Sequence, residues 1–152
     1  MAYHLAELNI ARMRGVNMDD PIMKDFKNNL DLINDIAEGS DGFIWRLKDD
    51  NNNATAFNPF NDEKIIVNMS VWRDIESLEN FAFKSGHVEY LRRKREWFET
   101  FGSAYVVFWW IPIGMLPTLE EAVVRLNYLN THGPTPHAFT FRNQFEPTNA
   151  IL

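Results

Sequence analysis

The stretch KIIVNMSVW, residues 64–72, carries the clearest strand pattern in the chain. Successive side chains of a strand point to opposite faces of its sheet. One face of this stretch is wholly apolar, with Ile65, Val67, Met69 and Val71. The other face mixes polar and aromatic side chains, with Ile66, Asn68, Ser70 and Trp72. We expect the apolar face to lie under helices and the mixed face to line a cavity or a partner subunit.

Similar patterns on either side of this stretch predict the remaining elements. Further strands are expected at residues 3–10, 42–47, 104–111 and 137–143. Helices are expected at residues 21–38, 74–85, 87–99 and 118–133. The order strand, helix, strand, strand, helix, strand, with one more helix and strand, is the ferredoxin-like plan. The sequence therefore predicts an α+β fold with an antiparallel sheet and helices on one face.

Three local features add detail to this plan. Residues 104–111, AYVVFWWI, are apolar on both faces, which predicts the central strand. Gly39 is expected to end the first helix in a left-handed conformation. The polar stretch at residues 48–63 predicts a long loop, which would serve as a lid or as a tether between two strands.

Size and composition exclude several classes of protein. The 152 residues predict a single domain, residues 1–152, and the absence of cysteine rules out disulfides and thiol-ligated metals. The formal charge of −6 argues against nucleic acid as a partner, and the basic run at 92–95 is expected to form ion pairs within its helix. No apolar run approaches the roughly 18 residues of a membrane span, and residues 1–15 lack the apolar core of a secretion signal. A cytoplasmic protein is expected.

Two long stretches resemble a known family. Residues 67–98, VNMSVWRDIESLENFAFKSGHVEYLRRKREWF, and residues 106–141, VVFWWIPIGMLPTLEEAVVRLNYLNTHGPTPHAFTF, resemble a bacterial domain family of unknown function within the dimeric α+β barrel superfamily. That superfamily includes antibiotic-biosynthesis-type and haem-degrading monooxygenases and muconolactone-isomerase-like enzymes. The resemblance implies a homodimer with a pocket between each sheet and its own helices.

His87 is the candidate catalytic residue. A neutral imidazole at a helix start could act as a general base or orient a substrate oxygen, although a structural histidine fits the same position. The tryptophans are candidate walls for a planar ligand, and the core is the alternative for each; those singled out are Trp45, Trp72, Trp97 and Trp110. Asn68 is expected to hydrogen-bond a ligand oxygen. No metal-ligand or nucleotide-binding motif occurs, so no metal or other cofactor is expected.

The leading hypothesis is a small-molecule pocket protein, acting as a cofactor-independent monooxygenase-like enzyme on a planar apolar or aromatic compound. The alternative is a non-catalytic ligand-binding protein or a structural dimer. A third hypothesis is haem binding through His87. In haem-degrading relatives an asparagine, a tryptophan and a histidine form the site; Asn9 and Trp72 match the first two, but Leu91 falls where the histidine would be.

Overall fold

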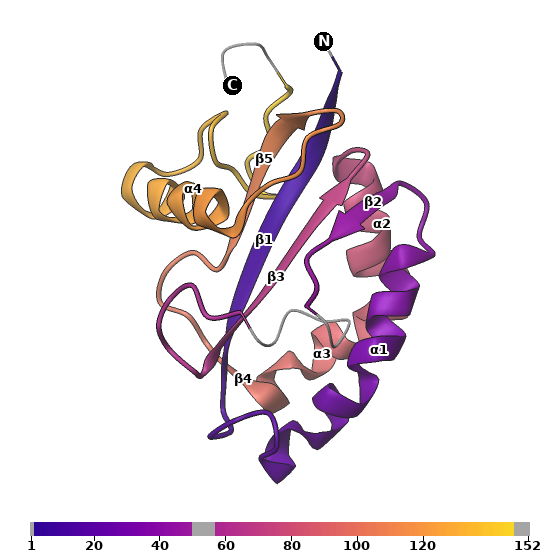
Figure 1. Cartoon of the computed structure of the whole chain (residues 1–152), viewed down its shortest axis with the longest axis vertical. Coiled ribbons are helices and arrows are strands. Elements are labelled where there is room, and N and C mark those ends of the chain that lie inside the picture. Colours follow the sequence, from indigo (N-terminus) through magenta and orange to yellow (C-terminus); the bar gives the residue numbers. More distant parts are fainter. Residues whose placement is uncertain (1, 50–56, 148–152) are drawn as a thin grey trace.

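The computed structural model describes residues 2–49 and 57–147, so part of the expected 48–63 loop lies outside the described residues. The chain forms one antiparallel sheet with helices packed around it (Figure 1). In chain order the elements are β1 (Tyr3–Met13), the short 3-10 helix η1 (Pro21–Met23), α1 (Lys24–Glu38), β2 (Phe43–Arg46), β3 (Ile65–Trp72), α2 (Ile75–Lys84), α3 (His87–Trp97), β4 (Phe98–Glu99), β5 (Val106–Pro112) and α4 (Leu119–His132).

Strand β1 is the centre of the sheet. Along one edge it pairs antiparallel with β3, and β2 pairs with the outer edge of β3. Along its other edge β1 pairs first with β5 and then, at residues 12–13, with the two-residue β4. The prediction of an antiparallel α+β fold is confirmed, and the element order is consistent with the ferredoxin-like plan. The expectation that residues 104–111 form the central strand is wrong, because β5 pairs with β1 alone among the named strands.

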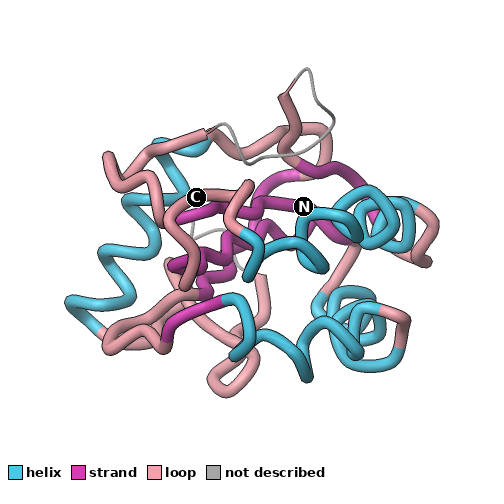
Figure 2. Tube along the Cα trace, turned by 90° about the horizontal axis from the view of Figure 1, so that it is seen from below, coloured by secondary structure: helices cyan, strands magenta, loops and turns pink. Residues whose placement is uncertain are grey.

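The helices lie on both faces of the sheet, as the view along the long axis shows (Figure 2). Helices α1 and α2 contribute Ala37 and Leu78 to one face, where they join Leu5 and Trp72. Helix α4 covers the opposite face, where its residues Ala122, Leu126 and Leu129 pack with the apolar set of β3. The expectation of helices on one face is therefore wrong for α4. The physical reason is β5, which is apolar on both faces and must be covered on both.

The prediction of a fifth strand at residues 137–143 is wrong. Among the described residues the one backbone bridge from this segment to the sheet joins Phe139 to Phe108, which exchange hydrogen bonds of 3.0 and 2.8 Å. On either side the segment folds back on itself, with bridges from Thr135 to Ala138 and from Thr140 to Asn143. These local turns compete with pairing along β5, so alternating apolar residues make one bridge instead of a strand.

Side-chain caps mark the starts of α2 and α4. The Asp74 carboxylate accepts a hydrogen bond of 2.8 Å from the Ser77 backbone N–H at the start of α2. At the start of α4 the Thr118 hydroxyl accepts a hydrogen bond of 3.1 Å from the Glu121 backbone N–H. Gly39 ends α1, but with φ of −85°, so the left-handed conformation expected there is wrong. That conformation occurs at Gly42, whose φ is +86° at the entry to β2.

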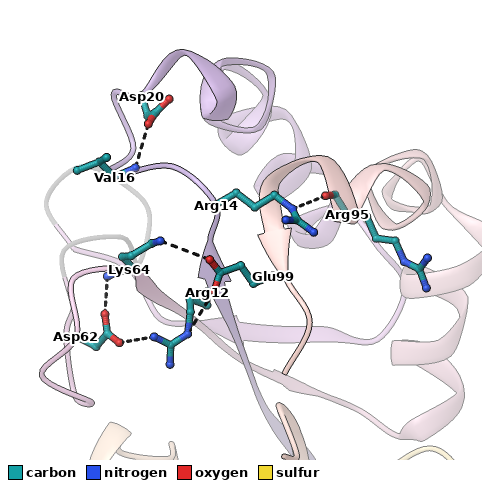
Figure 3. A network of polar contacts seen from close by, with 8 residues as sticks. All are labelled: Arg12, Arg14, Val16, Asp20, Asp62, Lys64, Arg95 and Glu99. Carbon is teal, nitrogen blue, oxygen red and sulfur yellow. Dashed lines mark hydrogen bonds and ion pairs between the residues drawn. The ribbon is translucent and has the colours of Figure 1, made fainter. Parts of the chain in front are cut away.

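A group of charged side chains joins the ends of three strands (Figure 3). Arg12 of β1 lies 2.8 Å from Asp62 and 3.9 Å from Glu99 of β4. Glu99 also lies 3.5 Å from Lys64, just before β3. These side chains are partly exposed, so each ion pair contributes little to stability. Their effect is to hold the short β4 beside β1.

Candidate functional site

The sheet face under α1, α2 and α3 carries two apolar clusters. The first surrounds Trp72 and includes Leu5, Leu78, Phe108 and Trp110. The second lies at the other end of β1 and consists of Met13, Met23 and Trp97. The strand register places polar residues between the two clusters, which splits this face of the sheet into two apolar ends and a polar middle.

We call this middle section the polar strip and define it as Glu7, Asn9, Asn68 and Ser70. Glu7 lies opposite Ser70, and Asn9 opposite Asn68, across the β1–β3 pair. Residues that lie opposite each other in an antiparallel pair have β-carbons about 4.5–5.5 Å apart, so the four side chains can act together. The strip thus brings together Asn68, a predicted site residue, with three polar neighbours.

Glu7 is the only buried acidic side chain in the part of the chain that the structure describes, with 4% of its surface exposed. Its carboxylate accepts hydrogen bonds from Ser70 Oγ at 2.8 Å and from Asn9 Nδ2 at 3.0 Å. Neither partner is charged. Burial raises the pKa of Glu7 from its ordinary value of 4.5 to about 7, although both hydrogen bonds act in the opposite direction.

The two oxygens of Glu7 are not equivalent. Trp72 Nε1 donates to Ser70 Oγ at 2.9 Å, and the Ser70 hydroxyl has one proton, which it donates to Glu7 Oε1. Asn9 Nδ2 donates to Oε2 at 3.0 Å and more weakly, at 3.3 Å, to Oε1. Oε2 therefore keeps more of its capacity to accept a hydrogen bond, and it is the oxygen on which a proton or a ligand donor fits best.

Solvent reaches one end of the polar strip. Exposure increases along it, from buried Glu7 and Ser70 through half-buried Asn9 to exposed Asn68, although Asn68 lies in the middle of β3. On α1 the inward-facing residues Leu30 and Ile33 also remain half-buried. The helices therefore leave this part of the sheet accessible.

His87, the predicted catalytic residue, begins α3 and lies near the Trp72 end of the strip. Its Nδ1 lies 3.1 Å from the Ala82 carbonyl oxygen, which can only accept a hydrogen bond. The neutral ring therefore carries its proton on Nδ1, and Nε2 is left free to accept a proton. Burial lowers the pKa of His87, which keeps the ring neutral near pH 7. The ring centroid lies 4.8 Å from that of Phe81, which stacks on Trp72 at 5.1 Å. Aromatic packing through Phe81 thus connects His87 to Trp72. Hydrogen bonds through Ser70 connect Trp72 to Glu7.

The tryptophans that were candidate ligand contacts lie in three places. Trp72 and Trp110 share the first apolar cluster, where the Trp110 indole N–H donates to the Phe145 carbonyl oxygen at 2.8 Å. Trp97 belongs to the second cluster and is 2% exposed. Trp45 packs on the opposite face of the sheet. Of the predicted ligand contacts, only Asn68 combines a place on this face with exposure to solvent.

Sequence reasoning did not identify Glu7 as a functional residue. A signal was present, because Glu7 interrupts the strand pattern of residues 3–10 on the side that also carries Leu5 and Asn9. A carboxylate in the middle of a strand is unremarkable when the strand lies at an edge. It becomes a buried group only because β1 is central, with β3 on one side and β5 on the other.

The basic run at residues 92–95 lies in α3. Within the basic run, Arg92 and Arg93 form the expected ion pairs in α3, with Glu89 at 2.8 Å and Glu96 at 2.9 Å. Among residues 2–49 and 57–147, no group of three or more His, Cys, Asp or Glu side chains could hold a metal ion. None of the described helices is both long enough and apolar enough to span a bilayer.

Comparison with known proteins identifies the family of the chain. Neither the curated proteins nor the solved structures include a match. One family matches residues 4–151, nearly the whole chain, and is described as "Domain of unknown function (DUF3291)". The chain that carries the polar strip therefore belongs to the DUF3291 family.

Proposed function

We propose that this protein binds a small molecule at the polar strip, with Glu7 as the central contact. The observation that carries the proposal is Glu7 itself, a buried carboxylate whose described partners are two neutral side chains. Burying a carboxylate without a cation costs several kcal/mol when it is ionised, and an apolar residue of similar size is often more stable at such a position. A ligand that supplies a proton donor or a positive charge offsets that cost.

The accessible end of the strip supports the same proposal. Asn68 offers an amide oxygen and an amide N–H, and it forms no hydrogen bond with its side chain in the part of the chain that the structure describes. Asn9 lies between Asn68 and Glu7 and is half-buried. A ligand that enters beside Asn68 would reach Asn9 first and then Glu7 Oε2.

A fragment screen by protein-observed NMR tests this proposal. Small neutral, cationic and anionic aromatic fragments are added to the labelled protein, and amide shifts are mapped onto the chain. We expect some fragments to shift the amides of residues 7–9 and 68–70, and we expect Asn68→Ala to weaken those fragments several-fold. Binding confined to other surfaces, with residues 7–9 and 68–70 unperturbed by every fragment, would refute the proposal.

A narrower proposal is a cofactor-independent monooxygenase-like reaction on a planar aromatic compound. The observation that favours it is the neutral ring of His87, whose Nε2 can accept a proton from a substrate hydroxyl. The resulting anion would pass its electrons to dioxygen, so the reaction consumes oxygen without a metal or flavin. Oxygen uptake with hydroquinone-type substrates, lost in His87→Ala, is the expected result. Uptake that is the same in His87→Ala would show that His87 does not catalyse the step.

The alternative of a non-catalytic ligand-binding protein predicts fragment binding at the polar strip without product. The haem hypothesis fits the geometry poorly. Trp72 is 1% exposed and stacked on Phe81, and Phe81 in turn lies against His87, so Asn9, Trp72 and His87 do not surround an open space. We derive no reaction step from haem.

We also propose a homodimer, which rests on the resemblance to the dimeric α+β barrel superfamily. In such a barrel the sheets of two subunits face each other. Here the face opposite α1 and α2 is buried within the chain, since Val67, Met69 and Val71 are all less than 5% exposed. We therefore expect any dimer to use a surface other than a bare sheet face. Native mass spectrometry distinguishes a dimer from a monomer.

A further inference from the structure

We infer that the ligand of the polar strip carries a protonated primary amine, held by Glu7, Asn9 and Asn68. The inference rests on the proposed function and names the chemical class of the ligand. The first step is the set of acceptors. An ammonium group has three N–H donors and no acceptor, so a site that fits it offers three oxygens close together.

The polar strip can supply these three oxygens. Glu7 contributes Oε2, which accepts one hydrogen bond of 3.0 Å from Asn9 Nδ2. Because the Asn9 amide nitrogen is used in that bond, its Oδ1 remains as an acceptor. Asn68 lies directly opposite Asn9, and its amide oxygen is a third acceptor. No described residue donates a hydrogen bond to the side-chain oxygen of Asn9 or Asn68.

Charge separates the amine from other ligands. An anionic ligand would be repelled by Glu7. The cation that the strand register places beside the strip is Arg46 of β2, opposite Ser70, and its guanidinium is already ion-paired with Glu38 at 2.8 Å. A neutral hydroxyl or amide can hydrogen-bond to Oε2 but leaves the buried negative charge uncompensated. An ammonium group supplies both the hydrogen bond and the opposite charge, and charge-assisted hydrogen bonds are the stronger kind. The ligand that gains most from this site is therefore a cation.

The surroundings of the strip indicate what the rest of the ligand looks like. Three half-buried apolar residues share the face of the strip: Ala11 of β1, Ile66 of β3 and Val106 of β5. They can cover an alkyl or aryl group but cannot bind a carboxylate. We therefore expect an alkylamine or arylalkylamine.

Calorimetry with three matched probes tests the inference. Benzylammonium, benzyl alcohol and benzoate share one ring and differ in charge. At pH 8 benzylammonium is expected to bind about tenfold or more tightly than benzyl alcohol, and benzoate weakest. Glu7→Gln should remove the advantage of benzylammonium over benzyl alcohol. Exposed Glu63 provides the matched control, because Glu63→Gln removes one negative charge elsewhere and should leave the advantage intact.

Two further measurements keep the result decisive. Asn68→Ala changes an exposed side chain, so it tests the site without the risk of unfolding, and it should weaken benzylammonium several-fold. Amide shifts at residues 7–9 and 68–70 report where each probe binds. Equal binding of benzylammonium and benzyl alcohol at the strip would overturn the amine inference and leave the proposed site intact. The inference would also be overturned if none of the three probes shifted the amides of the strip while other fragments did. If no fragment of any kind shifted them, both proposals would be overturned.

Discussion

Replacing Glu7 by glutamine should change how stability depends on pH. In the wild type the folded chain holds the Glu7 proton up to a pKa of about 7, whereas the unfolded chain releases it near 4.5. Between these values the folded state binds more protons, so stability falls as pH rises. The difference between 4.5 and about 7 corresponds to about 3 kcal/mol, at about 1.36 kcal/mol for each pH unit. Glutamine does not titrate in this range, so the Glu7→Gln variant does not lose this part of its free energy of unfolding as pH rises.

The measurement is urea unfolding followed by tryptophan fluorescence, at pH 5 and at pH 8, for both proteins. We expect the free energy of unfolding of Glu7→Gln, relative to wild type, to rise by about 2.5 kcal/mol between the two pH values. In a thermal scan this corresponds to a shift of roughly 5–10 °C in the difference between the midpoints. The glutamine side chain also alters the hydrogen bonds with Asn9 and Ser70, but that effect adds a constant at both pH values.

Glu63→Gln is the control for this experiment. Solvent reaches Glu63 in the folded chain as in the unfolded chain, so its removal should leave the difference from wild type the same at pH 5 and pH 8. The reasoning would be refuted if the Glu7→Gln and wild-type stabilities ran parallel across this range. That outcome would mean that Glu7 ionises as readily in the folded chain as in the unfolded one.

Three further predictions concern the elements around the site. Asp74→Ala removes the cap of α2, where the carboxylate accepts hydrogen bonds from the backbone N–H and the hydroxyl of Ser77. It should lower the free energy of unfolding in urea by about 1 kcal/mol, and Asp74→Ser should retain much of the wild-type stability. Gly42→Ala should lower the free energy of unfolding by about 2 kcal/mol or more, because φ there is +86° and a β-carbon would lie 2.1 Å from Ser77 Oγ. Gly102→Ala, where an added β-carbon would meet no atom within 4 Å, should be nearly neutral, and equal effects of the two substitutions would contradict the argument. Burial lowers the pKa of His87, so the unfolded chain binds the proton more readily and stability is lost as pH falls through 6.5. The free energy of unfolding of His87→Gln relative to wild type should therefore rise from pH 8 to pH 5, which is opposite in sign to the Glu7 effect. A constant difference would show that the ring titrates alike in both states.

Local patterns predicted most of the elements because their causes are local. The alternation in residues 64–72 corresponds to β3, and the capping residues Asp74 and Thr118 mark the starts of α2 and α4. Predictions failed where a distant segment decides the outcome. Residues 137–143 alternate like a strand, but they form turns, and among the described residues their one backbone bridge to β5 is at Phe139.

The candidate site shows the same division. Asn68 was identified from the mixed face of its own strand, and that face does carry the polar strip. His87 was placed correctly at a helix start, but its contact with Phe81, and through it with Trp72, depends on how α2 and α3 pack. The places of Trp45 and Trp97, in clusters other than that of Trp72 and Trp110, likewise depend on tertiary packing.

The sequence by itself determined the α+β class, the antiparallel sheet, the bounds of most helices and the polar character of one face of β3, since alternation, helical spacing and capping act over a few residues. Only the tertiary structure decided that β1 is the central strand and that α4 covers the second face of the sheet. It also decided that Glu7 is buried. The energy of a carboxylate depends on what surrounds it, and here the surroundings come from β3, β5 and the helices that the chain reaches tens of residues later.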